Sequence, residues 1–316
     1  MYIRIGTRGS KLALVQTEMA VQAIKKVYPE AVCEIVILQT TGDATQAANL
    51  SLQKLGGKGL FADSLRTNLE ENKVDLLVHS MKDLPSAQPP QFAIAAMLER
   101  GDPRDCLISN LPNVGRIEDL PQGAVLGTSS PRRAALALRR RPDLKVVNFR
   151  GNVPTRLEKL DSKVDAVAAT FLANVGLHRL GFDNVERVVF DVTDVLPPAG
   201  QGAIGLEIRA DDKSLAEKLQ RVNHVPTFRC VMAERACVAI LDGDCKTSVA
   251  AYAIEKDGRI NIKTDLFSSD GADYRHFSTA GSVEDFLTLG QSAGLSLMSQ
   301  IDKKDYPKLN IQSPST

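Results

Sequence analysis

Residues 124–159 read AVLGTSSPRRAALALRRRPDLKVVNFRGNVPTRLEK, and this stretch predicts two strands that each run into the start of a helix. The segments 124–127 and 145–149 are short and mostly apolar, as buried strands are. Ser130 followed by Pro131 is a typical helix start, because a serine side chain caps free N–H groups and proline fits the first helical position. The repeated strand and helix favour an α/β fold with parallel strands.

The same stretch concentrates positive charge. Residues 128–159 contain nine lysines and arginines against two carboxylates, a net charge of +7, whereas the whole chain of 316 residues carries +1. Arginine binds carboxylates and phosphates in bidentate pairs, and a helix N-terminus adds its own N–H donors. Residues 139–141, a helix length away, are expected to face solvent. Arginines also stand at three predicted strand ends, so we expect an anion site there: Arg8, Arg132, Arg133, Arg150 and Arg156.

The rest of the chain extends this alternation and then changes character. Further strands are predicted at 2–7, 33–40, 75–79, 92–98, 106–109 and 165–169, with helices at 11–27 and 58–71. Residues 43–57 are polar and glycine-ended, which predicts a loop that carries Lys54, with Lys58 beside it. Beyond residue 220 the pattern indicates an α+β module: a helix at 227–241, three strands at 249–255, 259–268 and 274–280 joined by Asp-Gly turns, and a closing helix.

We therefore predict two doubly wound α/β domains followed by a C-terminal α+β domain with a three-stranded antiparallel sheet. The first domain comprises residues 1–101 and 199–220, because the Pro/Gly-rich residues 196–202 (the crossing segment) lead the chain back to it. The second comprises 102–198 and contains the arginine-rich anion site. The third comprises 221–316.

Composition limits the classes of protein that fit. No apolar run approaches the ~20 residues of a membrane span, and no basic-then-apolar leader opens the chain. Five cysteines without paired spacing indicate reduced thiols, which predicts a cytoplasmic protein. Four dispersed histidines lack ligand spacing, so no metal is expected.

Two further segments could carry chemistry. Asp83 follows a buried strand with Lys82 beside it, and an ionised carboxylate there could stabilise a developing cation or move a proton. Taken alone, an aspartate before Leu-Pro fits a turn cap better than a catalytic group. Cys245 lies in a Gly- and Asp-rich turn with Lys246 next to it, and a lysine favours the thiolate. The residues alone fit a reactive thiol and an ordinary loop cysteine equally.

Taken together, these segments resemble the porphobilinogen deaminase (hydroxymethylbilane synthase) family. The resemblance runs from about Ile3 to the final helix and rests on several short motifs, each weak alone and specific in combination. They are TRGS at 7–10, GGKGLF at 56–61, VHSMKD at 78–83, GTSS at 127–130 with Arg132 and Arg133, RGNV at 150–153, GQGA at 200–203, and AER at 233–235 leading to Cys245.

The resemblance implies both a fold and a reaction. Two lobes similar to those of periplasmic binding proteins would enclose a cleft, and a third domain would carry the cofactor cysteine. The enzyme would be a transferase of porphyrin and haem biosynthesis that joins four porphobilinogen molecules head to tail, releases ammonia and yields linear hydroxymethylbilane. The chain would grow on a dipyrromethane held by Cys245 through a thioether.

The resemblance also implies roles for individual residues. Asp83 would be the catalytic carboxylate, and Lys54 and Lys58 would lie on or beside a lid. The acetate and propionate groups of substrate and cofactor would be bound by Arg8, Ser10, Ser80, Lys82, Thr128, Ser130, Arg132, Arg133, Arg150, Arg156 and Arg179.

Two other classes compete with this reading. A non-catalytic anion-binding module of the periplasmic type is disfavoured by the extra α+β domain and by Cys245. A nucleic-acid binder is disfavoured because the arginines fall at strand ends and almost no aromatic stacking partner lies near them. The expected partner is thus the small substrate porphobilinogen, with neither nucleic acid nor membrane, and the expected state is a monomer.

Overall fold

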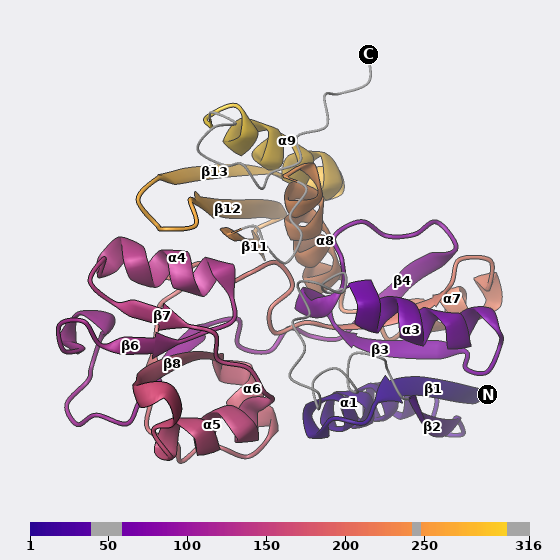
Figure 1. Ribbon diagram of the computed structural model, residues 1–316. Helices are drawn as coiled ribbons and strands as arrows, with labels where there is room; N and C mark the ends of the chain where they lie inside the picture. Colours follow the sequence, from indigo (N-terminus) through magenta and orange to yellow (C-terminus); the bar gives the residue numbers. More distant parts are fainter. Residues whose placement is uncertain (39–58, 242–247, 302–316) are drawn as a thin grey trace.

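The computed structural model describes residues 1–38, 59–241 and 248–301, and within these ranges the chain forms three sheets (Figure 1). Two five-stranded sheets with helices packed against them form two lobes, and a smaller three-stranded sheet forms the third part. None of the helices described is both long and apolar enough to cross a membrane. The predicted fold class is confirmed: two α/β lobes and a C-terminal α+β domain.

The first sheet has the strand order β2-β1-β3-β10-β4. Its strands are β1 (Tyr2–Arg8), β2 (Val32–Leu38), β3 (Leu76–Ser80), β4 (Phe92–Met97) and β10 (Ile204–Arg209). The helices α1 (Lys11–Val27), α3 (Gly59–Glu70) and α7 (Lys213–Gln220) contact this sheet. Its core is aliphatic, with Ile3, Ile5 and Leu206 at 1% exposure or less.

The second sheet has the order β7-β6-β8-β5-β9. Its strands are β5 (Asp105–Ser109), β6 (Val125–Gly127), β7 (Lys145–Val147), β8 (Val167–Ala173) and β9 (Val188–Val189). Its helices are α4 (Pro131–Arg140), α5 (Val153–Asp161) and α6 (Asn174–Arg179). The strand predicted at 165–169 starts later, because Asp165 and Ala166 adopt left-handed backbone angles (φ 54° for both).

The expectation of parallel strands holds for only part of each sheet. β1 pairs in parallel with β2 and β3, and β6 pairs in parallel with β7 and β8. β10 is antiparallel to β3 and β4, and β5 is antiparallel to β8 and β9, so both sheets are mixed. The reason is connectivity: the chain leaves the first sheet after β4 and returns to it only as β10, which inserts between β3 and β4.

The third sheet is the predicted antiparallel one. It consists of β11 (Ser248–Lys256), β12 (Arg259–Phe267) and β13 (Tyr274–Ser282), and its helices are α8 (Val225–Ile240) and α9 (Phe286–Met298). The turns at Asp257-Gly258 and around Gly271 place residues at positive φ, as the Asp-Gly signals predicted.

Candidate active site

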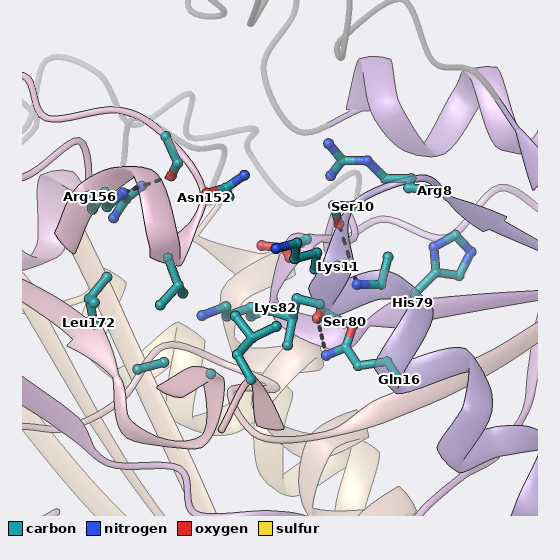
Figure 2. Close-up of a pocket in the computed structure, with 18 of the residues that line it drawn as sticks. Arg8, Ser10, Lys11, Gln16, His79, Ser80, Lys82, Asn152, Arg156 and Leu172 are labelled. Carbon is teal, nitrogen blue, oxygen red and sulfur yellow. Dashed lines mark hydrogen bonds between the residues drawn. The ribbon is translucent and has the colours of Figure 1, made fainter. Parts of the chain in front are cut away.

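A cavity of about 480 Å³ lies between the two α/β lobes. Figure 2 shows Asn152 and Arg156 on one side, Ser10 and Lys11 on the other, and Lys82 between them. The first lobe supplies residues that follow β1 and β3, and the second lobe supplies the starts of α4 and α5 and the end of β8. The polar and charged lining residues are Arg8, Ser10, Lys11, Gln16, His79, Ser80, Lys82, Asp83, Ser129, Arg133, Arg150, Asn152 and Arg156.

The local sequence explains why these side chains meet. Ser10, just after β1, accepts a hydrogen bond from Ala13 N (3.3 Å) and so caps α1. Ser130 likewise caps α4, and Asn152 caps α5 by accepting from Thr155 N (3.0 Å). Capping residues stop a strand and begin a helix within a few positions. The three helix starts therefore lie at strand ends that face the cavity.

The cavity lining carries far more positive than negative charge. Among the described residues it contains the cations Arg8, Lys11, Lys82, Arg133, Arg150 and Arg156, against the single carboxylate of Asp83. Burial, with the charge of Arg133 second, lowers the pKa of Arg156 to about 10. Burial also lowers the pKa of Lys82 to about 8. An anionic ligand would favour the charged form of both groups, so the site fits a polycarboxylate.

A buried carboxylate holds two of the predicted arginines. Asp105 is fully buried, and its side chain pairs with Arg132 and with Arg133 (Nη2–Oδ1 2.7 Å). Burial by itself raises the pKa of the Asp105 carboxyl, but the two guanidinium groups hold it well below its usual range. Arg133 also reaches the cavity, whereas Arg132 donates from Nη1 to Leu196 O (2.8 Å).

The structure brings together most, but not all, of the predicted site residues. Eight line the cavity: Arg8, Ser10, Ser80, Lys82, Asp83, Arg133, Arg150 and Arg156. Four described residues do not line it: Thr128 and Ser130 build the start of α4, Arg132 contacts Asp105, and Arg179 donates to Gly202 O (2.7 Å). Lys54, Lys58 and Cys245 lie outside the described residues.

Sequence reasoning missed several polar residues of the site. Gln16, in the second turn of α1, donates a hydrogen bond from Nε2 to Ser80 Oγ (2.7 Å). Asn152 caps α5. Asn152 could have been found, because asparagine before Val-Pro is a helix-start signal. His79 lines the cavity while its Nε2 lies 2.9 Å from the buried Glu207. Nothing in the sequence around Asp105 signalled its contacts with Arg132 and Arg133.

Within the described ranges, no group of three or more His, Cys, Asp or Glu side chains could hold a metal ion. The fold and the lining residues together define a two-lobed α/β protein with a cation-lined cavity between its lobes.

Comparison with known proteins identifies the family. Residues 3–217 match the domain described as "Porphobilinogen deaminase, dipyromethane cofactor binding domain", and residues 228–299 match "Porphobilinogen deaminase, C-terminal domain". The porphobilinogen deaminase of Alkaliphilus metalliredigens is 39% identical over 311 residues, covering 98% of this chain and 96% of that protein. That of Sphingopyxis alaskensis is 45% identical over 276 residues, 86% of each chain. The chain belongs to the porphobilinogen deaminase family, whose members are transferases, and the resemblance noted in the sequence is confirmed.

Among solved structures, an arginine-specific periplasmic binding protein from Salmonella typhimurium matches with a TM-score of 0.38 and 13% sequence identity. The match covers 70% of this chain and 91% of that protein.

Proposed function

We propose that this chain joins four porphobilinogen molecules head to tail, with loss of ammonia at each step, and that addition of one water molecule then releases hydroxymethylbilane. The growing product is held on a dipyrromethane that is attached through a thioether to Cys245. The observation that carries the proposal is the lining of the cavity, which among the described residues contains six cations and one carboxylate. Each porphobilinogen brings two carboxylates, so a growing oligomer needs many fixed cations, and arginines supply these in bidentate form.

The residues present fit the dipyrromethane as well as the substrate. Its acetate and propionate groups would be held by the cations that line the cavity, Arg133, Arg150 and Arg156 in the second lobe and Arg8 and Lys82 in the first. When bound, the group supplies a free pyrrole α-carbon as the nucleophile. Thr128, Ser130, Arg132 and Arg179 act indirectly in this proposal, because they shape the walls without lining the cavity.

Asp83 is the proposed catalytic residue. Its side chain is exposed to the cavity and follows Lys82 in the short helix Met81–Asp83, directly after β3. Loss of ammonia from porphobilinogen leaves positive charge on the pyrrole, and a carboxylate that accepts a hydrogen bond from the pyrrole N–H stabilises that charge. The same carboxylate can accept the proton released when the new bond forms.

We further propose that the chain works as a cytoplasmic monomer with domains at residues 1–101 with 199–220, at 102–198 and at 221–316. The sheets support the division, since β10, which follows the crossing segment, lies within the first sheet. The small acidic substrate accounts for the cationic cavity without a nucleic-acid partner.

Intact-mass spectrometry of the purified protein tests the proposal. We expect the mass to exceed that of the sequence by two pyrrole units, and we expect Cys245→Ser to remove the excess while the control Cys33→Ser keeps it. Asp83→Asn should keep the excess mass but lose turnover by roughly 10²-fold or more, the usual contribution of general acid–base groups. An unmodified wild-type mass after expression in a haem-making host, or wild-type turnover in Asp83→Asn, would contradict the proposal.

A further inference from the structure

The carboxylate of Asp105 is a junction between side chains from separate parts of the chain. It belongs to the first residue of β5, and Oδ1 accepts from Arg133 Nη2 at 2.7 Å, while Oδ2 accepts from Arg132 and from Arg133 Nε at 3.3 Å. Arg133 is further fixed by a bond from Nη1 to Phe171 O (3.0 Å). The direction of the Arg133 guanidinium is thus set by contacts outside the cavity.

A third partner connects Asp105 to the other lobe. Gln201 is fully buried in the segment that crosses back to the first sheet, and its Nε2 donates to Asp105 Oδ1 (2.8 Å) and to Pro103 O (2.6 Å). Its Oε1 accepts from Lys82 Nζ at 3.3 Å. This amide orientation is the consistent one, because the reverse would set an NH₂ group against an ammonium group.

We infer that Asp105 is a positioning residue for the proposed reaction, acting directly on Arg133 and through Gln201 on Lys82. The inference rests on the proposed function, since it assigns these two cations to substrate carboxylates. β5 lies in the second sheet and Lys82 follows β3 of the first, so a single carboxylate orients cations on both walls of the cavity.

The charge balance explains why one carboxylate is suited to this role. Asp105 offers one negative charge to two guanidinium groups, so the cluster keeps a net positive charge while its side chains are held in place. A second buried carboxylate would neutralise the arginines and compete with the carboxylates of the substrate. Asp105 therefore fixes the orientation of the Arg132 and Arg133 guanidinium groups without removing their attraction for an anion.

The protonation of Lys82 provides a readout that a purely structural role would not move. Burial lowers its pKa to about 8, while Asp83 and Asp105 raise it and Arg133 and Arg156 lower it further. Below that pH the ammonium donates to carboxylates, and above it the charge is lost. Removal of the negative charge of Asp105, or of the Gln201 oxygen, should let Lys82 lose its proton at lower pH.

Competitive labelling of the holoprotein with acetic anhydride across pH, followed by peptide mass spectrometry, measures this midpoint for Lys82. We expect it to fall by roughly 0.5–1 pH unit in Asp105→Asn and also to fall in Gln201→Met. The matched control is Asp102→Asn, a carboxylate three positions away that pairs with the more exposed Arg104, and its Lys82 midpoint should stay at the wild-type value. The KM for porphobilinogen should rise about tenfold in both test variants with a smaller change in kcat.

An unchanged Lys82 midpoint in folded Asp105→Asn and Gln201→Met would overturn the inference. If Asp105→Asn does not fold, Gln201→Met decides alone. It breaks the hydrogen-bonded connection between Asp105 and Lys82 but leaves Asp105 paired with Arg132 and Arg133. The labelling needs no substrate, so it gives its answer even if the protein proves unable to make hydroxymethylbilane. Failure of the inference and failure of the proposed function are thereby distinguished.

Discussion

Arg133 and Arg156 both line the cavity, but their surroundings within the protein differ. Arg133 is paired with the buried Asp105, whereas Arg156 donates from Nε to the neutral Gly151 O (2.9 Å) and has its pKa lowered by burial and by Arg133. The charge of Arg133 therefore contributes both to the fold and to the cavity. Burial and Arg133 oppose the charge of Arg156, Asp83 favours it, and a bound anion would favour it further.

Methionine in place of each arginine should separate these two effects. Arg133→Met leaves Asp105 with one partner fewer, and we expect the free energy of unfolding to fall by about 3 kcal/mol. Arg156→Met removes a cation disfavoured by its surroundings, so the free energy of unfolding should stay level or rise while the KM for porphobilinogen increases. Urea unfolding and steady-state kinetics measure both quantities. Equal destabilisation by the two substitutions would show that the attraction between Arg156 and Asp83 outweighs the effect of burial.

At the scale of elements, the turn between β12 and β13 packs against α4 of the second lobe (Figure 1). Phe267 is 5% exposed and belongs to the core of the second sheet, and Arg139 stacks over the ring of Tyr274 at 4.3 Å. Gly271 sits in this turn at φ 73°, where an added Cβ would lie 2.6 Å from Arg139 N and closer still to Ala135 O. The third domain thus contacts the helix whose start carries Arg132 and Arg133.

Replacing Gly258 and Gly271 by alanine should separate the cost of backbone strain from the cost of steric crowding. Gly258 has nearly the same φ, 70°, but nothing lies within 4 Å of an added Cβ, so Gly258→Ala should cost only about 1 kcal/mol. Gly271→Ala meets the backbone of α4 as well, and we expect a further loss of about 2 kcal/mol. Thermal unfolding of both variants gives the difference. Equal losses would mean that the turn moves away from α4 freely.

At the scale of the whole molecule, Glu234 of α8 joins the third domain to the first lobe and to the crossing segment. Its carboxylate accepts from Arg100 (Nη1–Oε1 2.6 Å), from Gly200 N (2.8 Å) and from Ala253 N (2.8 Å) in β11. The side chain is fully buried, so each of these donors depends on it.

Glu234→Gln should loosen this joint while the individual domains keep their folds. We expect the free energy of unfolding to fall by about 3–5 kcal/mol, because Arg100 is left without its buried counter-charge. Hydrogen exchange should rise first at residues 196–203 and in the first turns of α8. Glu284→Gln is the control, since Glu284 is 76% exposed where it pairs with Arg229 and should contribute at most about 0.5 kcal/mol. Similar losses in the two variants would rule out a special role for Glu234.

Local sequence determined the elements and the sheet edge at which the cation-lined cavity lies. Capping residues and short apolar segments act over a few positions, so Ser10, Ser130 and the Asp-Gly turns could be interpreted without tertiary contacts. Arg8 and Arg150, predicted at strand ends, and Arg156, predicted one turn into the next helix, all line one cavity.

Only the tertiary structure decided which cations face that cavity and which are used within the protein. Arg132 and Arg133 are adjacent in sequence, yet Arg132 is turned to Asp105 and Leu196 O. Arg141, expected to face solvent, instead donates to the carbonyls of Glu118, Leu120 and Pro121. Such contacts join residues tens of positions apart, and the antiparallel insertion of β10 depends on the same long-range packing. Local patterns cannot encode these pairings, because the partners lie far apart in the sequence and only the tertiary fold brings them together.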